Sequence, residues 1–564
     1  MDKKQKKAGR GRKGPVLIAL GVIVIAAAVL VIQRYMPTNE RMDPAAYFGY
    51  PEENQAAVVL QDHIAPERAL LQDGSLYLDY DMVREQINSR FYWDEGNNQM
   101  LFTTALETYE IPVNSRTYTI DGAENEYDRE IVLQNEAGLY LSIDFLQLYT
   151  NLDYTLDTET RHVLVRYQWG TQTTATVKRD TAVRYQGGIK SPILTEAEKG
   201  DTVRVLEQME NWSQVVTGDG YIGYVPNRRL EDVQETEVTR EFQEQEYSSL
   251  TRDEKITVVW HQIDVQEANS YLSQDIEQMT DVDVISPTWF SVTSIQGNIS
   301  SLASSDYVSQ AHAKGLEVWG LIDNFDKDVS TLDTLSVRSA RQHIIEMLLS
   351  EAKRVDLDGI NVDFEALTEE EAPHFIQFIR ELSVACRNNG LVLSVDNPVP
   401  QYTAFYNRKE QGIVADYVII MGYDEHTVGS ETAGSVASLP FVEEGITQTL
   451  SEVPKEKVIN GIPFYTRLWT EANNGMVTSE VCSMDQADAY VEKYNMDVYW
   501  NTDVSQNYAE AVTDSGVLKM WLEDEESLEE KMKLIQEYEL AGVAEWKLGF
   551  ERADVWKIIS NYIQ

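Results

Sequence analysis

Cysteine, histidine and basic side chains are scarce in this sequence. Its 564 residues include two cysteines, seven histidines and 47 Lys or Arg, against 93 Asp or Glu. Two cysteines rule out a disulfide framework and leave open only a single bridge, between Cys386 and Cys482. The formal net charge of −46 argues against nucleic acid and anionic lipid as partners, because such a surface repels polyanions. Cationic and neutral partners stay open.

Long apolar runs are also absent, with one exception near the N-terminus. Seventeen apolar residues run without interruption from Val16 to Ile32, after a basic segment at residues 1–14. This length is near the lower limit for crossing a bilayer, and the basic flank favours the cytoplasmic side. We therefore expect a cytoplasmic tail at 1–14, a transmembrane anchor at 15–33 and the bulk of the chain outside the cell membrane. A cleaved signal peptide, which would make the protein secreted, is the alternative.

A chain of this length needs several domains, because a single core rarely extends beyond about 300 residues. An internal repeat lies in the first half, where residues 76–102 align with residues 139–165 at an offset of 63. Each copy has the pattern of a strand, a short helix and a hairpin. The repeat resembles the copper amine oxidase N-terminal-like domain of bacterial surface proteins, and we expect this α+β domain over residues 60–170. No copper is implied, since His162 is the only histidine between residues 76 and 180 and one histidine is not a metal site.

The sequence changes again at residues 175–232, where short strands alternate with Gly and Asp turns. This pattern is typical of a small all-β barrel. The Y-I-G-Y-V-P segment after W-x-x-V resembles a bacterial Src-homology-3-like domain, which implies contact with cell-wall peptide. Trp212, Tyr221 and Tyr224 either form an aromatic binding face or fill the core of this small barrel. Residues 233–254, rich in Glu and Gln, are typical of a solvated linker or an exposed helix.

Residues 255–564 form the largest predicted domain. Eight segments have the composition of buried strands: residues 255–263, 281–292, 316–323, 359–365, 391–398, 415–424, 457–465 and 542–550. Amphipathic helical stretches separate most of them, such as residues 368–388, which open with T-x-x-E and end before Gly390. Eight strand–helix units predict a (β/α)8 TIM barrel with its active site at the C-terminal strand ends. Asp396 and Asn397 fall at one of these ends, and residues 468–522 are expected to form a strand-rich insert.

The segment D-G-I-N-V-D-F-E, residues 358–365, is the most informative one. Alternate side chains of a strand face opposite sides, so Asn361, Asp363 and Glu365 share one side. A strand buried on both faces should be almost wholly apolar, so carboxylates two residues apart are costly, and chemistry is the preferred explanation. A half-exposed antiparallel strand with a solvated polar face is the alternative. Repulsion between the two carboxylates should raise the proton affinity of one of them, which keeps a Glu protonated near neutral pH.

This segment resembles the D-G-x-D-x-D-x-E signature of glycoside hydrolase family 18, the family of chitinases and cell-wall N-acetylglucosaminidases. Residues 421–426, 461–469 and 542–551 resemble later segments of the family in the same order, and the resemblance covers about residues 254–564. Asn361 departs from the signature, because many members have aspartate there. It removes a group that could take up the proton of Asp363, so we expect a shifted pH optimum and retained activity.

The resemblance implies a retaining mechanism that uses no cofactor and no metal. The 2-acetamido group of the substrate would attack the anomeric carbon, Glu365 would act as general acid and then base, Asp363 would hold the acetamide N–H, and Tyr423 would bind its oxygen. The other substrate-binding candidates are Asn361, Asp424, Trp260, Trp546, Tyr465 and Arg467. For Trp546 and Tyr465 the alternative is a place in the core, and for Arg467 it is an ion pair with an acidic loop.

The whole sequence predicts an extracytoplasmic glycoside hydrolase that cleaves N-acetylglucosamine-containing glycan. An outward-facing anchor, a Src-homology-3-like module and the tetrapeptide Y-D-E-H, which resembles the spore-cortex and wall branch of the family, favour peptidoglycan as the substrate. A chitinase or chito-oligosaccharide hydrolase is the first alternative. A non-catalytic protein that binds wall glycan is the second, and the presence of Glu365 argues against it. A scaffold whose repeated domains matter more than the barrel is the third.

Overall fold

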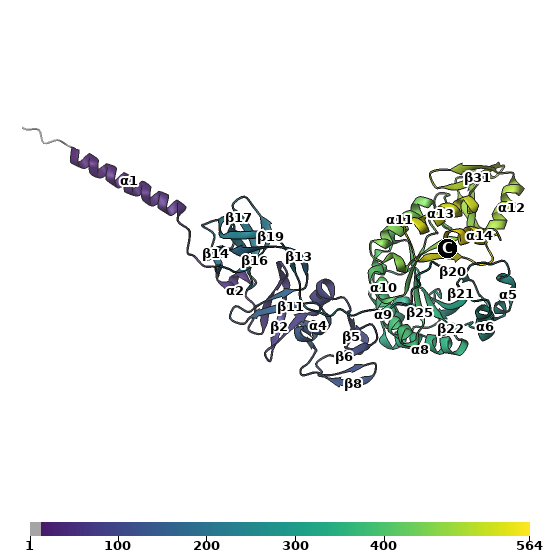
Figure 1. Ribbon diagram of the computed structural model, residues 1–564, viewed down its shortest axis with the longest axis horizontal. Helices are drawn as coiled ribbons and strands as arrows, with labels where there is room; N and C mark the ends of the chain where they lie inside the picture. Colours follow the sequence, from purple (N-terminus) through teal and green to yellow (C-terminus); the bar gives the residue numbers. More distant parts are fainter. Residues whose placement is uncertain (1–12, 564) are drawn as a thin grey trace, which may run out of the picture. The chain divides into compact units, whose positions relative to one another are not determined.

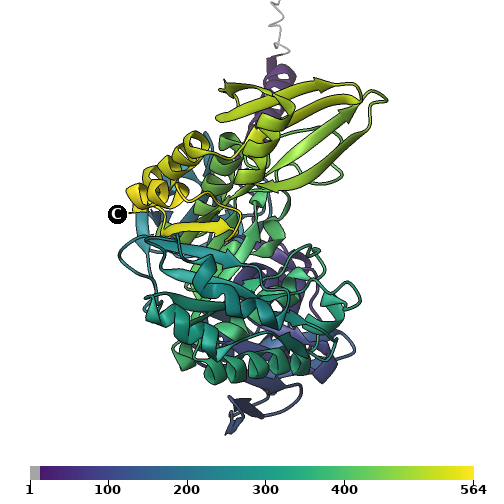
Figure 2. The same cartoon turned by 90° about the vertical axis from the view of Figure 1, so that its right-hand side faces the viewer.

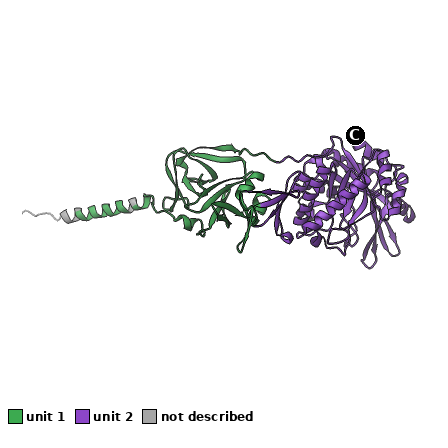
Figure 3. Cartoon of the chain, turned by 90° about the horizontal axis from the view of Figure 1, so that it is seen from below, with its two compact units in different colours: residues 1–89, 114–116, 128–244 green, residues 90–113, 117–127, 245–564 purple. Residues whose placement is uncertain are grey.

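The computed structural model describes residues 13–563 of the chain. The chain divides into two compact units (Figure 3). The first comprises Met1–Ser89, Asn114–Arg116 and Asp128–Glu244. The second comprises Arg90–Val113, Thr117–Tyr127 and Gln245–Gln564. The second unit therefore takes two short segments from the first half of the chain.

An apolar helix, α1 (Lys13–Tyr35), is the first element described (Figure 1). Its segment Ile18–Tyr35 has a mean hydropathy of 2.2, and none of it is buried. By length and composition this helix can cross a membrane, and a signal sequence near the N-terminus meets the same criteria. The apolar run is therefore helical, whereas most of the expected cytoplasmic tail lies outside the described residues.

The repeat predicted in the first half is visible as two copies of one local pattern. In the first copy β3 leads through α3 and a π-helical turn into the hairpin β4–β5; in the second, β10 leads through α4 into the hairpin β11–β12. A seven-stranded sheet in the order β11-β12-β1-β2-β3-β10-β9 holds most of these strands. The bounds are β1 (Gln55–Leu60), β2 (His63–Gln72), β3 (Ser75–Asp79), α3 (Tyr80–Met82), the π-helical turn (Val83–Ile87), β9 (Val132–Asn135), β10 (Gly138–Ser142), α4 (Ile143–Tyr149), β11 (Asp153–Asp157) and β12 (His162–Arg166).

A second seven-stranded sheet forms the small all-β domain that the sequence predicts, in the order β15-β14-β18-β17-β16-β13-β19. Its core is mainly valine, and the aromatic ring of Tyr221 is buried against Phe48 with ring centroids 5.1 Å apart. Tyr221 thus belongs to the interior, whereas Trp212 and Tyr224 are half-buried. The bounds are β13 (Gly170–Val177), β14 (Thr181–Arg184), β15 (Ile193–Ala197), β16 (Thr202–Gln208), β17 (Trp212–Val216), β18 (Ile222–Pro226) and β19 (Leu230–Val238).

The second unit contains the predicted TIM barrel (Figures 1 and 2). Within the described residues eight parallel strands follow the order β20-β33-β27-β26-β25-β24-β23-β21, and pairing of β20 with β21 closes the ring. These strands are β20 (Ile256–His261), β21 (Val284–Val292), β23 (Glu317–Asp323), β24 (Gly359–Asp363), β25 (Val392–Pro398), β26 (Tyr417–Met421), β27 (Val458–Pro463) and β33 (Gly542–Trp546). Each lies within or close to a segment expected from the sequence, because strands covered on both sides are continuously apolar.

Helices surround the barrel, and a short strand, β22 (Ile299–Ser301), pairs antiparallel with β21. The T-x-x-E hydrogen bonds form, since the backbone N of Thr368 donates to Glu371 Oε2 over 2.7 Å and the Glu371 backbone N donates to Thr368 Oγ1 over 3.3 Å. They lie in the turn before the helix, which begins at Ala372 and not at Thr368 as predicted. The helix that follows, α9 (Ala372–Asn389), is capped at its C-terminus by Gly390, whose backbone lies in the left-handed region at φ 68°. The helices are α5 (Leu272–Asp275), α6 (Ser305–Ala313), α7 (Thr331–Leu335), α8 (Arg338–Val355), α9 (Ala372–Asn389), α10 (Arg408–Val414), α11 (Leu439–Leu450), α13 (Glu525–Glu537) and α14 (Val555–Ile563).

The strand-rich insert expected after the seventh barrel strand is a five-stranded antiparallel sheet with one helix. Its strand order is β29-β28-β32-β31-β30. The helix begins with a capping box in which Ser483 and Gln486 bond reciprocally to each other's backbone. The bounds are β28 (Tyr465–Ala472), β29 (Val477–Ser483), α12 (Met484–Tyr494), β30 (Asp497–Asn501), β31 (Gln506–Thr513) and β32 (Gly516–Leu522).

A further antiparallel sheet, in the order β4-β5-β6-β7-β8, packs against α8 and α9 of the barrel within the second unit. The Tyr92 hydroxyl lies 2.5 Å from Nδ1 of His374, and the Arg341 guanidinium lies over the Tyr92 ring at 5.0 Å. Beneath this contact Glu381 accepts hydrogen bonds from Arg338 and Arg341. The first repeat copy therefore contributes its hairpin to the barrel surface. The bounds are β4 (Phe91–Asp94), β5 (Gln99–Thr103), β6 (Thr108–Pro112), β7 (Thr117–Ile120) and β8 (Ala123–Glu126).

Candidate active site

Three carboxyl groups meet at the C-terminal ends of adjacent barrel strands. Asp323 ends β23, Asp363 ends β24, and the two are paired in register. Pairing of Val362 with Val395 places Asp396 of β25 beside Asp363 one step further along both strands. All three side chains are buried. The barrel topology therefore gathers acidic groups that lie far apart in the sequence.

Asn361 lies at the centre of a hydrogen-bond network below these carboxyl groups. Its Oδ1 accepts from Trp260 Nε1 over 2.9 Å and from Ser286 Oγ over 3.1 Å. Its Nδ2 donates to Ser394 Oγ over 3.0 Å and to Asp396 Oδ1 over 2.8 Å. The indole N–H is only a donor, so the amide must present its oxygen to Trp260 and its NH2 group to Asp396. Both Asn361 and Trp260, predicted to bind substrate, are fully buried within the barrel.

Burial and mutual repulsion raise the proton affinity of the carboxyl groups. Burial, and then the charge of Asp396, raise the pKa of Asp363 well above its usual range. Burial, reinforced by Glu365, raises the pKa of Asp396 to about 8. Burial also raises the pKa of Asp323, which accepts hydrogen bonds from Ser291 Oγ and from the backbone N of Phe325. These groups cannot all be ionised near neutral pH, because like charges at short range disfavour one another.

Glu365 follows β24 by two residues and is partly exposed, unlike Asp363. Asn324 holds its backbone at two points: the Glu365 N–H donates to Asn324 Oδ1 over 2.9 Å, and Asn324 Nδ2 donates to the Glu365 carbonyl over 3.1 Å. Burial, and then the charges of Asp424 and Asp323, raise the pKa of the Glu365 carboxyl group. A partly exposed carboxylic acid with a raised pKa can give a proton to a molecule bound at the strand ends.

Aromatic side chains line the neighbouring strand ends. Tyr423 follows β26 and is nearly buried, with its ring in edge contact with Trp260 at 6.4 Å and with Tyr465 at 6.1 Å. The Tyr465 hydroxyl donates to Asp424, which is exposed. Gly461 makes room for this arrangement, since a Cβ there would lie 2.9 Å from the Ile420 carbonyl oxygen and 3.1 Å from the Tyr423 ring.

Trp546 and Arg467 are the remaining predicted residues. Trp546 ends β33, is half-buried and lies in edge contact with Trp260 at 5.9 Å, so part of its ring stays accessible for a ligand. Arg467 belongs to β28, and its side chain is 8% exposed. Its Nη1 donates to Ser479 Oγ over 3.1 Å, and among the described side chains it has no carboxylate partner at ion-pair distance. Arg467 therefore sits inside the insert rather than against an acidic loop.

Sequence reasoning assigned no role to three residues at this site, namely Asp323, Asn324 and Asp396. Asp396 carries the same local signal as Asp363, a carboxyl group two residues after a buried polar side chain at the end of an apolar strand. The predicted barrel makes the two strands neighbours, but the sequence does not give the register that sets Asp396 level with Asp363. Both cysteines are buried and free, which answers the question of a Cys386–Cys482 bridge. In the described part of the chain no group of three or more His, Cys, Asp or Glu side chains could hold a metal ion.

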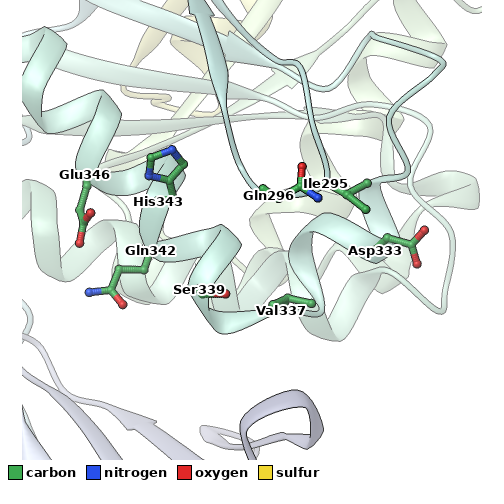
Figure 4. Close-up of a pocket in the computed structure, with 8 residues that line it drawn as sticks. All are labelled: Ile295, Gln296, Asp333, Val337, Ser339, Gln342, His343 and Glu346. Carbon is green, nitrogen blue, oxygen red and sulfur yellow. The ribbon is translucent and has the colours of Figure 1, made fainter.

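A separate surface pocket of about 610 Å³ lies on the outside of the barrel (Figure 4). The loop after β21 forms one wall, and α7 and α8 form the other. The lining residues are Ile295, Gln296, Asp333, Val337, Ser339, Gln342, His343 and Glu346. None of the strand-end carboxyl groups is among them, so this pocket is distinct from the site described above.

Comparison with known families identifies each of the expected modules. The model described as glycosyl hydrolases family 18 matches residues 251–551. A bacterial SH3 domain matches residues 180–231, and a copper amine oxidase N-terminal domain matches residues 61–165. The three resemblances inferred from the sequence are thereby confirmed.

Curated relatives and solved structures agree with this assignment. The uncharacterized glycosylase YvbX of Bacillus subtilis (strain 168) is 26% identical over 279 residues, which make up 47% of this chain and 80% of that protein. The cortical fragment-lytic enzyme of Bacillus anthracis is 23% identical over 245 residues, 42% of this chain and 56% of that protein, so this chain spans little more than half of its length. The crystal structure of the Bacillus cereus spore cortex-lytic enzyme SleL has a TM-score of 0.50 at 20% identity, covering 59% of this chain and 78% of that one, and shows a shared fold.

Proposed function

The chain belongs to glycosyl hydrolase family 18 and is a glycoside hydrolase, and from this premise we propose that it cleaves N-acetylglucosamine-containing glycan of the bacterial cell wall, with peptidoglycan as the substrate. The observation that carries the proposal is the state of Glu365. The carboxyl group of this residue is partly exposed at the strand ends and has a raised pKa. Its backbone N–H is hydrogen-bonded to the side chain of Asn324. It is therefore suited to donate a proton to a glycosidic oxygen.

We propose a substrate-assisted mechanism. Glu365 protonates the leaving oxygen while the acetamido oxygen of the substrate attacks the anomeric carbon, so that a cyclic intermediate forms and the glycosidic bond breaks. Asp363 accepts a hydrogen bond from the acetamide N–H and balances the positive charge of the intermediate, and Tyr423 donates to the acetamido oxygen. Glu365, now ionised, then takes a proton from the water that opens the ring, which restores the starting state and retains the anomeric configuration.

We assign substrate contacts to the exposed parts of the same strand ends. Trp546, half-buried at the end of β33, offers a ring face on which the apolar side of a sugar can stack. Asp424 is exposed and oriented by Tyr465, so its carboxylate can accept hydrogen bonds from sugar hydroxyl groups. Asn361, Trp260 and Arg467 are buried, and in this proposal they support the groups that touch the glycan.

Peptidoglycan is preferred to chitin because of the domains that accompany the barrel and because of its curated relatives. A bacterial SH3 domain accompanies it, and curated relatives include enzymes described as cortical fragment-lytic. Helix α1 is apolar enough for a membrane anchor, which would hold residues 60–564 on the wall side of the cell membrane. Chito-oligosaccharide hydrolysis is the second candidate, favoured by the family itself. In this proposal the SH3-like domain contacts wall peptide.

The central experiment compares wild type with Glu365→Gln on a chromogenic N-acetylglucosaminide and on purified peptidoglycan. We expect turnover to fall by about 10²–10⁴-fold, because a positioned general acid contributes that much. Glu370→Gln is the matched control, since Glu370 is an exposed acid in the loop that follows Glu365. Equal turnover of wild type and Glu365→Gln would refute the assigned acid.

The substrate is tested by mass spectrometry of digested wall. New N-acetylglucosamine reducing ends would support peptidoglycan hydrolysis, whereas activity confined to chito-oligosaccharides would establish the second candidate. Binding to wall without turnover of either glycan would indicate a non-catalytic protein. Cell fractionation with N-terminal sequencing of the mature chain tests the anchor: an intact N-terminus in the membrane fraction supports it, and a processed chain in the medium contradicts it.

A further inference from the structure

Two carboxylate oxygens at the strand ends are buried without a hydrogen-bond partner among the described residues. They are Oδ1 of Asp363 and Oδ2 of Asp396. A buried carboxylate oxygen left without a donor is costly, and a proton placed between two such oxygens removes that cost for both. The pairing of β24 with β25 places the two side chains next to each other.

The Asn361 amide determines how Asp396 is oriented. Its oxygen is already occupied by Trp260 and Ser286, so its NH2 group must face Asp396 and donates to Oδ1 over 2.8 Å. This bond holds Asp396 by one oxygen and leaves Oδ2 as the free one. Asparagine at position 361, where aspartate is common in the family, places no charge next to Asp363. A carboxyl group from the neighbouring strand stands there instead.

The charges that act on this pair are all negative. Asp363 is influenced first by Asp396, then by Glu365 and Asp323, and no cation among the described residues contributes. The titratable groups that face the pair are Asp323 from β23, Glu365 after β24, Tyr406 from the helical turn Ala404–Tyr406, and Tyr423 and Asp424 after β26. With no cation to balance two charges, a pair that holds one proton is favoured over a doubly ionised pair.

We propose that Asp396 is a positioning residue that acts through Asp363: the two carboxyl groups share one proton, which passes to Asp396 when substrate binds and leaves Asp363 ionised toward the acetamide. The inference rests on the proposed substrate-assisted mechanism. In the transfer the O–H bond at Asp363 Oδ1 breaks and an O–H bond at Asp396 Oδ2 forms. The pair keeps one proton and one negative charge throughout, so no further reactant is needed.

Asp396→Asn separates this role from a purely structural one. The asparagine keeps the size of the side chain and can still accept from Asn361, but it cannot take up a proton. In a double variant, Asn361→Asp with Asp396→Asn, the carboxyl group next to Asp363 comes from position 361 of the same strand, β24. Ser394→Ala is the matched control, because it removes the other acceptor of Asn361 without changing any charge.

We expect Asp396→Asn to lower kcat by about 10–100-fold with little change in KM, because burial still favours protonated Asp363 and no neighbouring carboxylate can take up its proton when substrate binds. Without the neighbouring carboxyl group the pKa of Asp363 falls, so the acid limb of kcat/KM moves to lower pH by about one unit. The double variant should regain at least about tenfold in kcat and shift the limb back, as expected if the shared proton is what matters. Ser394→Ala should keep the wild-type pH profile.

If Asp396→Asn keeps the wild-type pH profile and kcat, Asp396 is only a hydrogen-bond acceptor and the proposal is wrong. A double variant whose kcat is no higher than that of Asp396→Asn would equally overturn the proposal. If Asp396→Asn does not fold, infrared titration of the wild type replaces it. We expect a protonated carboxyl band that persists at neutral pH and is lost in Asp363→Asn; a wild-type spectrum without this band at neutral pH would contradict the shared proton. The infrared result stands even if no N-acetylglucosamine glycan is cleaved, so the two proposals can fail separately.

Discussion

Replacing Glu381 by glutamine would leave the buried guanidinium group of Arg341 without a carboxylate partner, and would leave Arg338 with Glu110 alone. The side chains of Arg341 and Glu381 are 0% and 2% exposed, and their nearest N–O distance is 3.0 Å. Arg338 contacts the other carboxylate oxygen over 2.9 Å and is 11% exposed. Tyr92, from the sheet β4–β8, stacks on Arg341 and excludes water from this side. The variant therefore tests both the ion pair and the packing of that sheet on α8 and α9.

The expected magnitude follows from the burial. Removing one partner of a buried ion pair costs about 3–5 kcal/mol, because the remaining charge stays desolvated. For a unit of roughly 350 residues, an unfolding entropy of about 2.1 cal/mol/K per residue gives roughly 0.7 kcal/mol/K, so the melting temperature should fall by about 4–7 °C. Burial alone would raise the pKa of Glu381, but Arg341 and Arg338 outweigh it and lower that pKa.

The sign of the pH dependence follows from this lowered pKa. The stability that the Glu381 charge contributes is fully present above its unfolded pKa of about 4.3 and is lost as the pH falls through the lower folded value. The difference in melting temperature between wild type and Glu381→Gln should thus be constant from neutral pH to about pH 5 and shrink below about pH 4.

Differential scanning fluorimetry across this pH range measures the effect, with Glu530→Gln as the control. Glu530 pairs with Lys533 three residues away on α13, and both side chains are substantially exposed, so its loss should cost less than about 1 kcal/mol. The double variant Arg341→Met with Glu381→Gln should recover part of the loss, because one unpaired charge is removed. If Glu381→Gln melts no lower than Glu530→Gln, the guanidinium groups are hydrated and the sheet does not seal this face.

Two further predictions concern the acid. Asn324→Ala removes both hydrogen bonds to the backbone of Glu365, and steady-state kinetics should show kcat lowered by about tenfold or more with KM little changed; an equal loss in the exposed control Asn298→Ala would contradict this. Asp323→Asn removes a negative charge that helps to raise the pKa of Glu365, so the alkaline limb of kcat/KM should move to lower pH, and an unmoved limb would show that Asp323 does not act on the acid.

Much of the barrel could be predicted because its signals are local. Continuous apolar runs separated by amphipathic stretches marked all eight strands, and the T-x-x-E segment marked the turn directly before α9. The place of Glu365 after a strand followed from the same pattern. The sheet assignment of the repeat could not be predicted in this way: its copies have similar sequences, yet β11–β12 joins the first unit while β4–β5 packs on the barrel.

The sequence alone determined which side chains of β24 share a face, because alternation along a strand is a property of the local backbone. Asn361, Asp363 and Glu365 could therefore be grouped from their spacing in the chain. Only the tertiary structure decided that Asp396 lies beside Asp363, that Asn324 holds the backbone of Glu365, and that both cysteines are free. The predicted barrel already makes consecutive strands neighbours, whereas these contacts depend on the register between the strands and on the orientation of the side chains, which are fixed when the whole apolar surface is buried.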